Sequence, residues 1–281
     1  DMPGLGESHP LPYPTLGSYV MALSELLDQL GTPTVDVLAE GLGTCFAIAL
    51  AAHRPSQVRR VVLDGVPMVS SRERRLVARD YCPPIGPDRH GTHLLKIWHQ
   101  LRDAELTWPW FDRAADAARI RDPELDPQRL HAALVEVMKH LPSYGDASRA
   151  ALEASVRDIL RGVHQPVLLF DAAGDTRYSG TGRVARRLAA SEVVPRPPDV
   201  AGRIESVRRF LSAASTSAPQ PPMAPPSVGV AMPRKIVPST RKIRTTGGTS
   251  DESTRRPRSQ PRSVRAEGAS AGADDGLKML I

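Results

Sequence analysis

Three short segments carry the side chains whose types and spacing could do chemistry. The first is a glycine-flanked turn, Ala39-Glu40-Gly41-Leu42-Gly43, whose one ionisable group is the Glu40 carboxyl. The second ends at Asp175, which follows an apolar run and a glycine. The third contains His93 and, a little further on, Trp98. Carboxylates and imidazoles are common general acids and bases, so these segments are candidates for proton transfer if the fold brings them together.

Each candidate also has a plainer structural explanation. Glu40 could act as an acid or base, or it could only make a local hydrogen bond in the turn. Cys45 could serve as a substitute nucleophile near a helix start, but the apolar run that follows it favours burial. His93 shares a predicted helical face with Ile97, so His93 and Trp98 either contact a ligand or pack into a core. The histidines have no carboxylate at a ligand-like spacing, and the sequence predicts no metal and no cofactor.

The glycine turn lies between two elements that would hold it in place. Val35–Ala39 is predicted to be a short buried strand, and Thr44–His53 a helix that ends before Pro55. A second buried strand is predicted at Arg60–Asp64, and an amphipathic helix at Tyr19–Leu30 precedes the first strand. This order of strand, turn, helix and strand predicts a parallel βαβ unit and therefore an α/β fold.

Residues 66–163 show no convincing strand pattern and are predicted to be a helical insertion. Its helices are expected around Leu94–Glu105, Leu130–Met138 and Ala150–Leu160. Beyond it, the apolar patterns predict two more strands and two more helices: Pro166–Asp171, Gly182–Ala190, Glu192–Val194 and Asp199–Ala213.

The net charge of +6 belongs to the end of the chain. Residues 212–281 hold 11 Lys and Arg against 5 Asp and Glu, whereas the two signs balance in residues 1–211. The segment 212–281 has no aromatic residue, and we predict a disordered basic tail because it cannot offset the entropy of ordering. Without aromatics to stack on bases, the tail argues against nucleic-acid binding. The longest apolar stretch, Cys45–Ala52, is too short to span a membrane, so we expect a cytoplasmic protein.

The motifs and their order resemble the α/β-hydrolase family over residues 1–211. Asp1-Met2-Pro3-Gly4-Leu5-Gly6-Glu7-Ser8 is similar to the loop that follows the fourth strand of that fold, and the sequence starts inside it, so we expect further residues upstream. The turn at Gly41 resembles the nucleophile elbow, G-x-S-x-G. The resemblance implies a partial α/β-hydrolase core, 1–65 and 164–211, with 66–163 as a helical cap.

The resemblance also implies a catalytic triad, and the sequence matches it poorly. Gly41 stands where the nucleophilic serine is expected and cannot act as one, while Asp175 falls at the position of the acid. The histidine is expected near Pro195–Asp199, where none occurs. Of the two oxyanion-hole donors, the Leu42 N–H is matched, and the second would lie before Asp1.

Three functions therefore remain open. The chain is a hydrolase-fold pseudoenzyme that at most binds a small apolar molecule, for which Leu42, His93 and Trp98 are the predicted contacts. Alternatively, it is an active ester or carbon–carbon hydrolase with a non-standard site that includes Glu40, Asp175 and cap histidines such as His93. A third reading is an interaction protein that works through its basic tail. The strand at Val35–Ala39 would lack a neighbour on one side, so a homo-oligomer through this exposed edge is also expected.

Overall fold

The computed structural model describes residues 1–67, 74, 77, 79–113, 123–175, 178–213 and 278–280. The predicted tail, 212–281, lies outside these residues apart from its first two positions and a short strand near its end. The described residues all belong to one compact unit, 1–226 together with 276–281.

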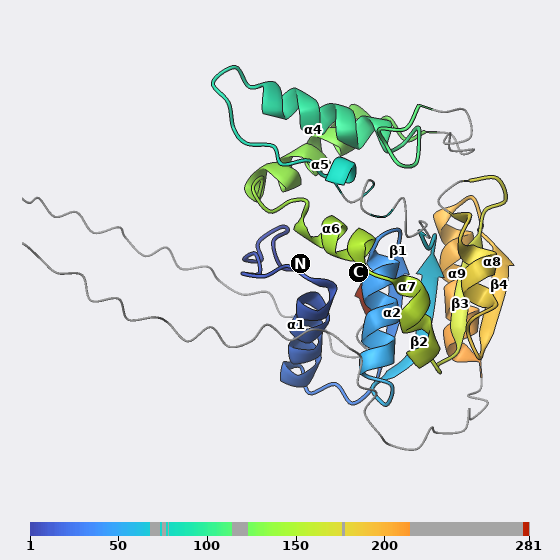
Figure 1. Cartoon of the computed structure of the whole chain (residues 1–281). Coiled ribbons are helices and arrows are strands. Elements are labelled where there is room, and N and C mark those ends of the chain that lie inside the picture. Colours follow the sequence, from blue (N-terminus) through green and yellow to red (C-terminus); the bar gives the residue numbers. More distant parts are fainter. Residues whose placement is uncertain are drawn as a thin grey trace, which may run out of the picture. The chain divides into compact units, whose positions relative to one another are not determined.

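A parallel sheet with the strand order β4-β3-β2-β1-β5 forms the centre of the fold (Figure 1). Its strands are β1 (Val35–Glu40), β2 (Val58–Asp64), β3 (Val167–Asp171), β4 (Ser191–Pro195) and β5 (Lys278–Leu280). The register pairs Glu40 with Asp64 at the carboxyl ends of β1 and β2. The first four strands confirm the α/β prediction, with bounds shifted by one or two residues.

The helices that pack against this sheet lie on both of its faces. The helices of the described residues are α1 (Leu16–Gln29), α2 (Gly43–His53), α4 (Thr92–Asp103), α5 (Pro127–Lys139), α6 (Asp146–Glu153), α7 (Val156–Ile159), the 3-10 turn η2 (Leu160–Gly162), α8 (Thr181–Ala185) and α9 (Val200–Ser212). No helix in the described ranges has the length and apolarity needed to cross a membrane.

Alternate residues of the strands enter two separate cores. Val37, Leu63 and Leu169 pack with α1 and α2 on one face. Val62 and Leu168 pack on the other face against α9. Helix α2 is buried almost all round, which explains why its sequence is apolar on every side rather than on one stripe.

A buried arginine ties α9 to the sheet. Arg60 on β2 is only 4% exposed, and its guanidinium donates to the carbonyl oxygens of Leu211 and Ala213. It also lies 5.7 Å from the centre of the Phe210 ring. These acceptors include carbonyl groups that the end of a helix leaves without partners in the helix itself, so Arg60 both caps α9 and satisfies its own buried charge.

Between β2 and β3, the described residues form the helices α4 to α7 and η2, joined by turns and loops, and these helices pack in two places. Helices α4 and α5 share a small core of their own around Ile97 and Leu141. Helices α6 and α7 instead contact α2 and contribute Ala151 and Val156 to the main core. The single helix predicted at Ala150–Leu160 is wrong, because α6 ends at Glu153 and a new turn starts at Val156. A cap spanning 66–163 stays a prediction.

Candidate functional site

The elbow at Gly41 has the backbone conformation of a strand-to-helix nucleophile turn. Gly41 has φ +58°, in the left-handed region that favours glycine. Its N–H donates to the Asp64 carbonyl oxygen at 2.9 Å, and its own carbonyl oxygen accepts from the Thr44 hydroxyl at 2.6 Å. A Cβ atom built at position 41 would meet nothing within 4 Å. The turn is therefore fixed to β2 and α2, and it opens on free space where a side chain would stand.

Leu42 provides the backbone donor that the family pattern predicts at this turn. It precedes the first residue of α2, and within the described residues its N–H has no backbone acceptor. Its carbonyl oxygen accepts from the Cys45 N–H at 3.1 Å. The N–H groups at the start of a helix favour negative charge, which fits the predicted oxyanion-hole role of Leu42, and that role stays a prediction.

An arginine lies in the segment where the histidine was expected. Arg196 follows β4 directly, and its Nε donates to both carboxylate oxygens of Asp64, at 2.9 and 3.0 Å. Its guanidinium also lies 3.9 Å from the exposed Glu40 carboxylate. The side chains of Arg196 and Asp64 are 16% and 10% exposed. Burial lowers the pKa of Arg196, but the hydrogen bond and charge of Asp64 outweigh it and raise the pKa above its usual value.

Tyr178 completes this network from the loop that carries Asp175. The Tyr178 hydroxyl donates to Asp64, and its ring packs 3.4 Å from the Cβ position of Gly65. The Tyr178 N–H donates to the Asp175 carbonyl oxygen at 3.0 Å. Asp64 is therefore a buried carboxylate, 7% exposed and bound by two side chains. We call Arg196, Asp64 and Tyr178 the Arg196 network.

Asp175 is itself buried, with 6% of its surface exposed. Its N–H donates to the Ala172 carbonyl oxygen at 3.0 Å, which closes a tight turn after β3. The backbone on both sides of Asp175 thus shapes the loop that delivers Tyr178 to Asp64. These backbone bonds tie the loop after β3, and a catalytic role for Asp175 stays a prediction.

The predicted ligand contacts His93 and Trp98 lie on α4. His93 interacts with its own turn: its N–H donates to Asp88 at 3.0 Å, and its Nδ1 accepts from the Asp88 N–H at 3.2 Å. Trp98 is half-buried on the same helix. Over the described part of the chain, no hydrogen bond, ion pair or ring contact joins either side chain to Gly41 or Leu42. Their role as ligand contacts stays a prediction.

The carboxylate beside His93 acts as a cap for α4. Asp88 accepts from the N–H groups of His90, Thr92 and His93 and from the Thr92 hydroxyl. The hydroxyl bond, followed by the backbone bonds, holds the pKa of Asp88 well below its usual value despite some opposing desolvation. Among the described residues, no group of three metal-ligating side chains comes together.

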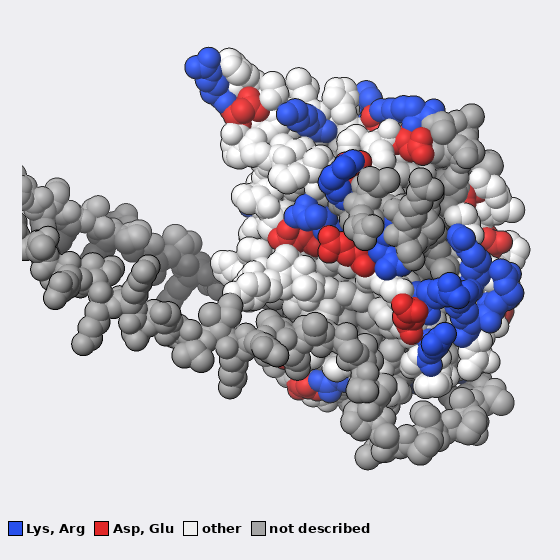
Figure 2. All heavy atoms as spheres, in the orientation of Figure 1, with Lys and Arg blue, Asp and Glu red and all other residues white. Residues whose placement is uncertain are grey.

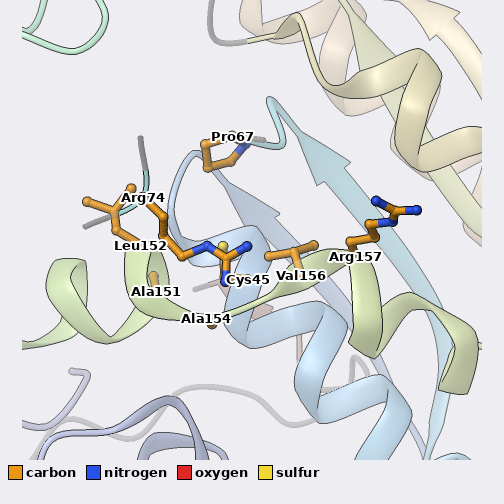
Figure 3. A pocket seen from close by; sticks show the side chains of 8 residues that line it. All are labelled: Cys45, Pro67, Arg74, Ala151, Leu152, Ala154, Val156 and Arg157. Carbon is orange, nitrogen blue, oxygen red and sulfur yellow. The ribbon is translucent and has the colours of Figure 1, made fainter. Parts of the chain in front are cut away.

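A small hollow lies near the elbow helix, over Cys45 (Figure 3). Its volume is ≈ 30 Å³, and it is lined by Cys45, Pro67, Arg74, Ala151, Leu152, Ala154, Val156 and Arg157. Figure 3 shows the Arg74 side chain directed toward Cys45, while the Arg157 guanidinium points away. Sites for drug-sized ligands span several hundred Å³, so this hollow holds a water-sized guest.

Cys45 at the floor of this hollow is not an activated thiol. It is 1% exposed, and burial raises its pKa from the ordinary 9.0 to about 12. Reactive cysteines need a lowered pKa and access to solvent. The idea of Cys45 as a substitute nucleophile is therefore wrong, and its burial follows from the apolar pattern around it.

Charge on the described surface is mixed rather than uniformly basic. In the view of Figure 2, Lys and Arg stand beside Asp and Glu over much of the surface, and they gather toward the side where α8 lies in Figure 1. Helix α8 and the residues after it carry the exposed Arg183, Arg186 and Arg187. The charge balance of residues 1–211 thus hides one local gathering of arginines.

Comparison with known proteins identifies the fold. No family model and no curated protein matches the sequence. Among solved structures, a hydrolase from Pseudomonas aeruginosa is similar with a TM-score of 0.51 and 20% identity, over 75% of this chain and 74% of that chain. An esterase from Exiguobacterium antarcticum has a TM-score of 0.51 and 14% identity, over 75% and 78%. A bromoperoxidase from Bacillus anthracis has a TM-score of 0.54 and 15% identity, over 75% and 78%. The chain has an α/β-hydrolase fold.

Sequence reasoning missed Arg196 and Tyr178. A signal existed for Arg196, because Asp64 ends one parallel strand and Arg196 follows another, and the carboxyl ends of parallel strands meet at one edge. The family pattern predicts a histidine in that segment, so it gives the arginine no role. Tyr178 had no comparable signal, because nothing in the sequence fixes the direction of the loop after β3.

Proposed function

We propose that this chain is an α/β-hydrolase-fold protein without Ser-His-Asp hydrolase activity, a pseudoenzyme of the fold. One observation carries the proposal: the elbow has the left-handed backbone and the open space of a nucleophile turn, yet its central residue is Gly41. Glycine supplies no oxygen to attack a carbonyl carbon. In a serine protease, removal of the nucleophile costs about 10⁶ in kcat.

The Arg196 network supports the same proposal from the other side of the site. A general base must accept a proton within hydrogen-bond reach of the nucleophile. A guanidinium stays protonated and accepts no hydrogen bond, and Asp64 raises the pKa of Arg196 further. Arg196 is also held on Asp64 by two hydrogen bonds. It therefore serves as a structural cation where the fold's chemistry needs a base.

Binding of a small apolar molecule remains the most that we propose for a ligand. The hollow over Cys45 supports this limit, because its volume is ≈ 30 Å³ and its lining joins apolar side chains to Arg74 and Arg157. A guest would have to be close to the size of a water molecule unless the lining moved. A fluorescent apolar reporter of ordinary size should therefore show no saturable binding to the folded chain.

An esterase assay tests the loss of activity. The full chain at micromolar concentration should hydrolyse p-nitrophenyl acetate and butyrate no faster than its Gly41→Ala variant. In that variant, Arg196 and Asp64 are unchanged. Both should match a buffer blank that contains an inert protein of similar lysine content. Saturable turnover at the 1 s⁻¹ or more that is usual for enzymes would overturn the proposal.

The rival function is a non-standard hydrolase that uses Glu40, His93 and Asp175. If the full chain turned over an ester, the variants Glu40→Gln, His93→Ala and Asp175→Asn would separate the rivals. A loss in all three variants would support the non-standard site. If all three variants kept their turnover, the activity would lie elsewhere in the chain. That outcome would exclude both the non-standard site and the pseudoenzyme proposal.

A further inference from the structure

The guanidinium group of Arg196 uses only part of its hydrogen-bonding capacity within the protein. Its Nε donates to both carboxylate oxygens of Asp64, at 2.9 and 3.0 Å. Over the described part of the chain, its terminal nitrogens, Nη1 and Nη2, donate no hydrogen bond to another residue. Most N–H donors of an arginine belong to these terminal nitrogens. The bonds to Asp64 therefore fix the guanidinium and leave its terminal side for a further acceptor.

Glu40 places an opposite charge beside these terminal nitrogens. Its Oε1 lies 3.9 Å from Nη2 of Arg196, which is beyond hydrogen-bond distance. The Glu40 side chain is 57% exposed, whereas that of Arg196 is 16% exposed. Glu40 directly precedes Gly41, where a Cβ atom would meet nothing within 4 Å. A fixed cation and an accessible carboxylate therefore lie side by side, next to the open space at the elbow.

We propose that Arg196 and Glu40 form a binding site for a small zwitterion of the α-amino acid type. The carboxylate of the ligand accepts from the terminal nitrogens of Arg196, because a planar guanidinium matches the geometry of a carboxylate. The ammonium group of the ligand donates to Glu40. In such a ligand the two opposite charges are neighbours, as they are on the protein, so each ligand charge meets its opposite.

Net charge favours a zwitterion over a simple anion or cation. Arg196, Asp64 and Glu40 are one cation and two carboxylates, so the cluster has a formal charge of −1. A ligand with only a carboxylate adds a further negative charge close to Glu40, and a phosphate group adds still more. A ligand with only an ammonium group leaves the terminal nitrogens of Arg196 without an acceptor. A zwitterion leaves the net charge unchanged and matches both groups.

This site goes beyond the proposed loss of hydrolysis and does not depend on it. It is separate from the hollow over Cys45, whose lining includes neither Arg196 nor Glu40. The volume of that hollow therefore sets no limit on a ligand at Arg196. Asp64 keeps its structural role, because the ligand contacts the side of the guanidinium that Asp64 leaves unused.

Norvaline and its two truncated forms separate the two charges of the ligand. Pentanoate lacks the ammonium group, and butylammonium lacks the carboxylate. Each is titrated into the full chain at fixed ionic strength, with the NMR signals of the Arg196 side chain as the reporter. We expect norvaline to bind saturably and roughly tenfold more tightly than either truncated form, because each form loses one charge-assisted contact. Equal affinity for either truncated form, or no saturable binding of norvaline, would overturn the proposal.

Variants that change one charge or its geometry assign the contacts. Glu40→Gln should weaken norvaline binding roughly tenfold and strengthen pentanoate binding, because it removes both the ammonium partner and a like charge. Arg196→Lys keeps a cation beside Asp64 but removes the planar guanidinium, and it should weaken norvaline binding to a similar extent. Glu205→Gln and Arg208→Lys are the matched controls, from an exposed ion pair of 3.6 Å on α9. Both should bind norvaline like the unchanged chain.

Urea denaturation shows whether each variant is folded. If Arg196→Lys is not folded, Glu40→Gln carries the test alone, since Glu40 is exposed and takes no part in the bonds from Arg196 to Asp64. Unchanged affinities of Glu40→Gln for norvaline and pentanoate would refute the site. Control variants that weaken norvaline binding as much as Glu40→Gln does would refute it as well.

Discussion

The two sides of the candidate site differ in what they keep of the fold's chemistry. At the elbow, the backbone of a nucleophile turn is present and the side chain is missing: Gly41 holds φ +58° with free space around its Cβ position. After β4, the side-chain position is filled, but by a different residue type: Arg196 is bound to Asp64. The elbow has the backbone geometry but no reactive side chain, whereas the segment after β4 carries an ion pair.

This difference has a physical cause. The elbow backbone is set by the sheet and by α2, because Gly41 bonds to Asp64 and Thr44, and it persists whether or not an oxygen is attached. After β4, the Arg196 N–H donates to the Asp171 carbonyl oxygen at 2.7 Å, and the Arg196 side chain adds its bonds to Asp64. In the pseudoenzyme that we propose, the elbow therefore keeps its backbone without a reactive oxygen, and the residue after β4 takes a structural role.

Arg196→Leu should have the largest effect on this comparison. It leaves the Asp64 carboxylate buried without its cation, and removal of one partner of a buried pair costs about 3–5 kcal/mol. Urea denaturation followed by circular dichroism measures the loss of unfolding free energy. The double variant Arg196→Leu with Asp64→Leu should recover part of it. Equal losses in the single and double variants would show that the two side chains do not act as a pair.

Gly41→Ser should cost less, because the site is spacious but the backbone is left-handed. A non-glycine residue in this conformation costs roughly 1–2 kcal/mol, and the new Cβ meets no neighbour. We expect a loss of that size in urea denaturation and no gain in esterase rate, since the segment where the fold's histidine is expected holds Arg196. Gly41→Asn is the control and should cost less than Gly41→Ser, because asparagine tolerates this region better. A gain in ester turnover would show that a base is present after all.

Sequence reasoning reached the sheet and the elbow but not the Arg196 network. The apolar runs at Val35, Val61 and Val167 specify buried parallel strands by themselves, because a strand covered on both faces needs no alternation. Gly41 was identified because a turn between strand and helix has a local signature. The bond from Arg196 to Asp64 spans strands that are distant in sequence, and several arginines were equal candidates. Such pairings depend on tertiary packing rather than on local pattern.

Helix ends show the same limit on a smaller scale. The periodicity across Ala150–Leu160 fits one helix, yet the chain breaks after Glu153 because Ala154 is extended. This break lets Ala151 and Val156 both reach the core beside α2. Local propensity alone gives no reason for the break, since none of these residues is glycine or proline.

Tyr178→Phe should have a smaller effect than either substitution above. It removes the hydroxyl that donates to Asp64 but leaves Arg196 in place to satisfy the carboxylate. The net value of one hydrogen bond is about 0.5–1.5 kcal/mol, and bonds to charged groups reach the upper part of that range or exceed it. Urea denaturation gives the loss, and Tyr144→Phe, in the separate core around Ile97, is a control of the same chemistry. A loss of 3 kcal/mol or more for Tyr178→Phe would mean that Tyr178, not Arg196, is the main partner of Asp64.

Substitution of Cys45 should have the smallest effect on stability. The reactivity of its thiol tests whether helix α2 carries another nucleophile. Burial raises the pKa of this thiol to about 12, so at pH 8 the native chain should react with iodoacetamide only through unfolding. Cys82→Ala isolates this thiol, and mass spectrometry follows its modification.

The pH dependence of stability gives a second test of Cys45. The folded chain holds the Cys45 thiol proton more tightly than the unfolded chain does, in which the pKa of the thiol is near 9.0. Stability from this group is therefore complete below pH 9 and declines as pH rises toward 12. Cys45→Ala should flatten that decline and leave stability at pH 7 nearly unchanged, whereas rapid alkylation of the folded chain at pH 8 would return Cys45 to the list of nucleophiles.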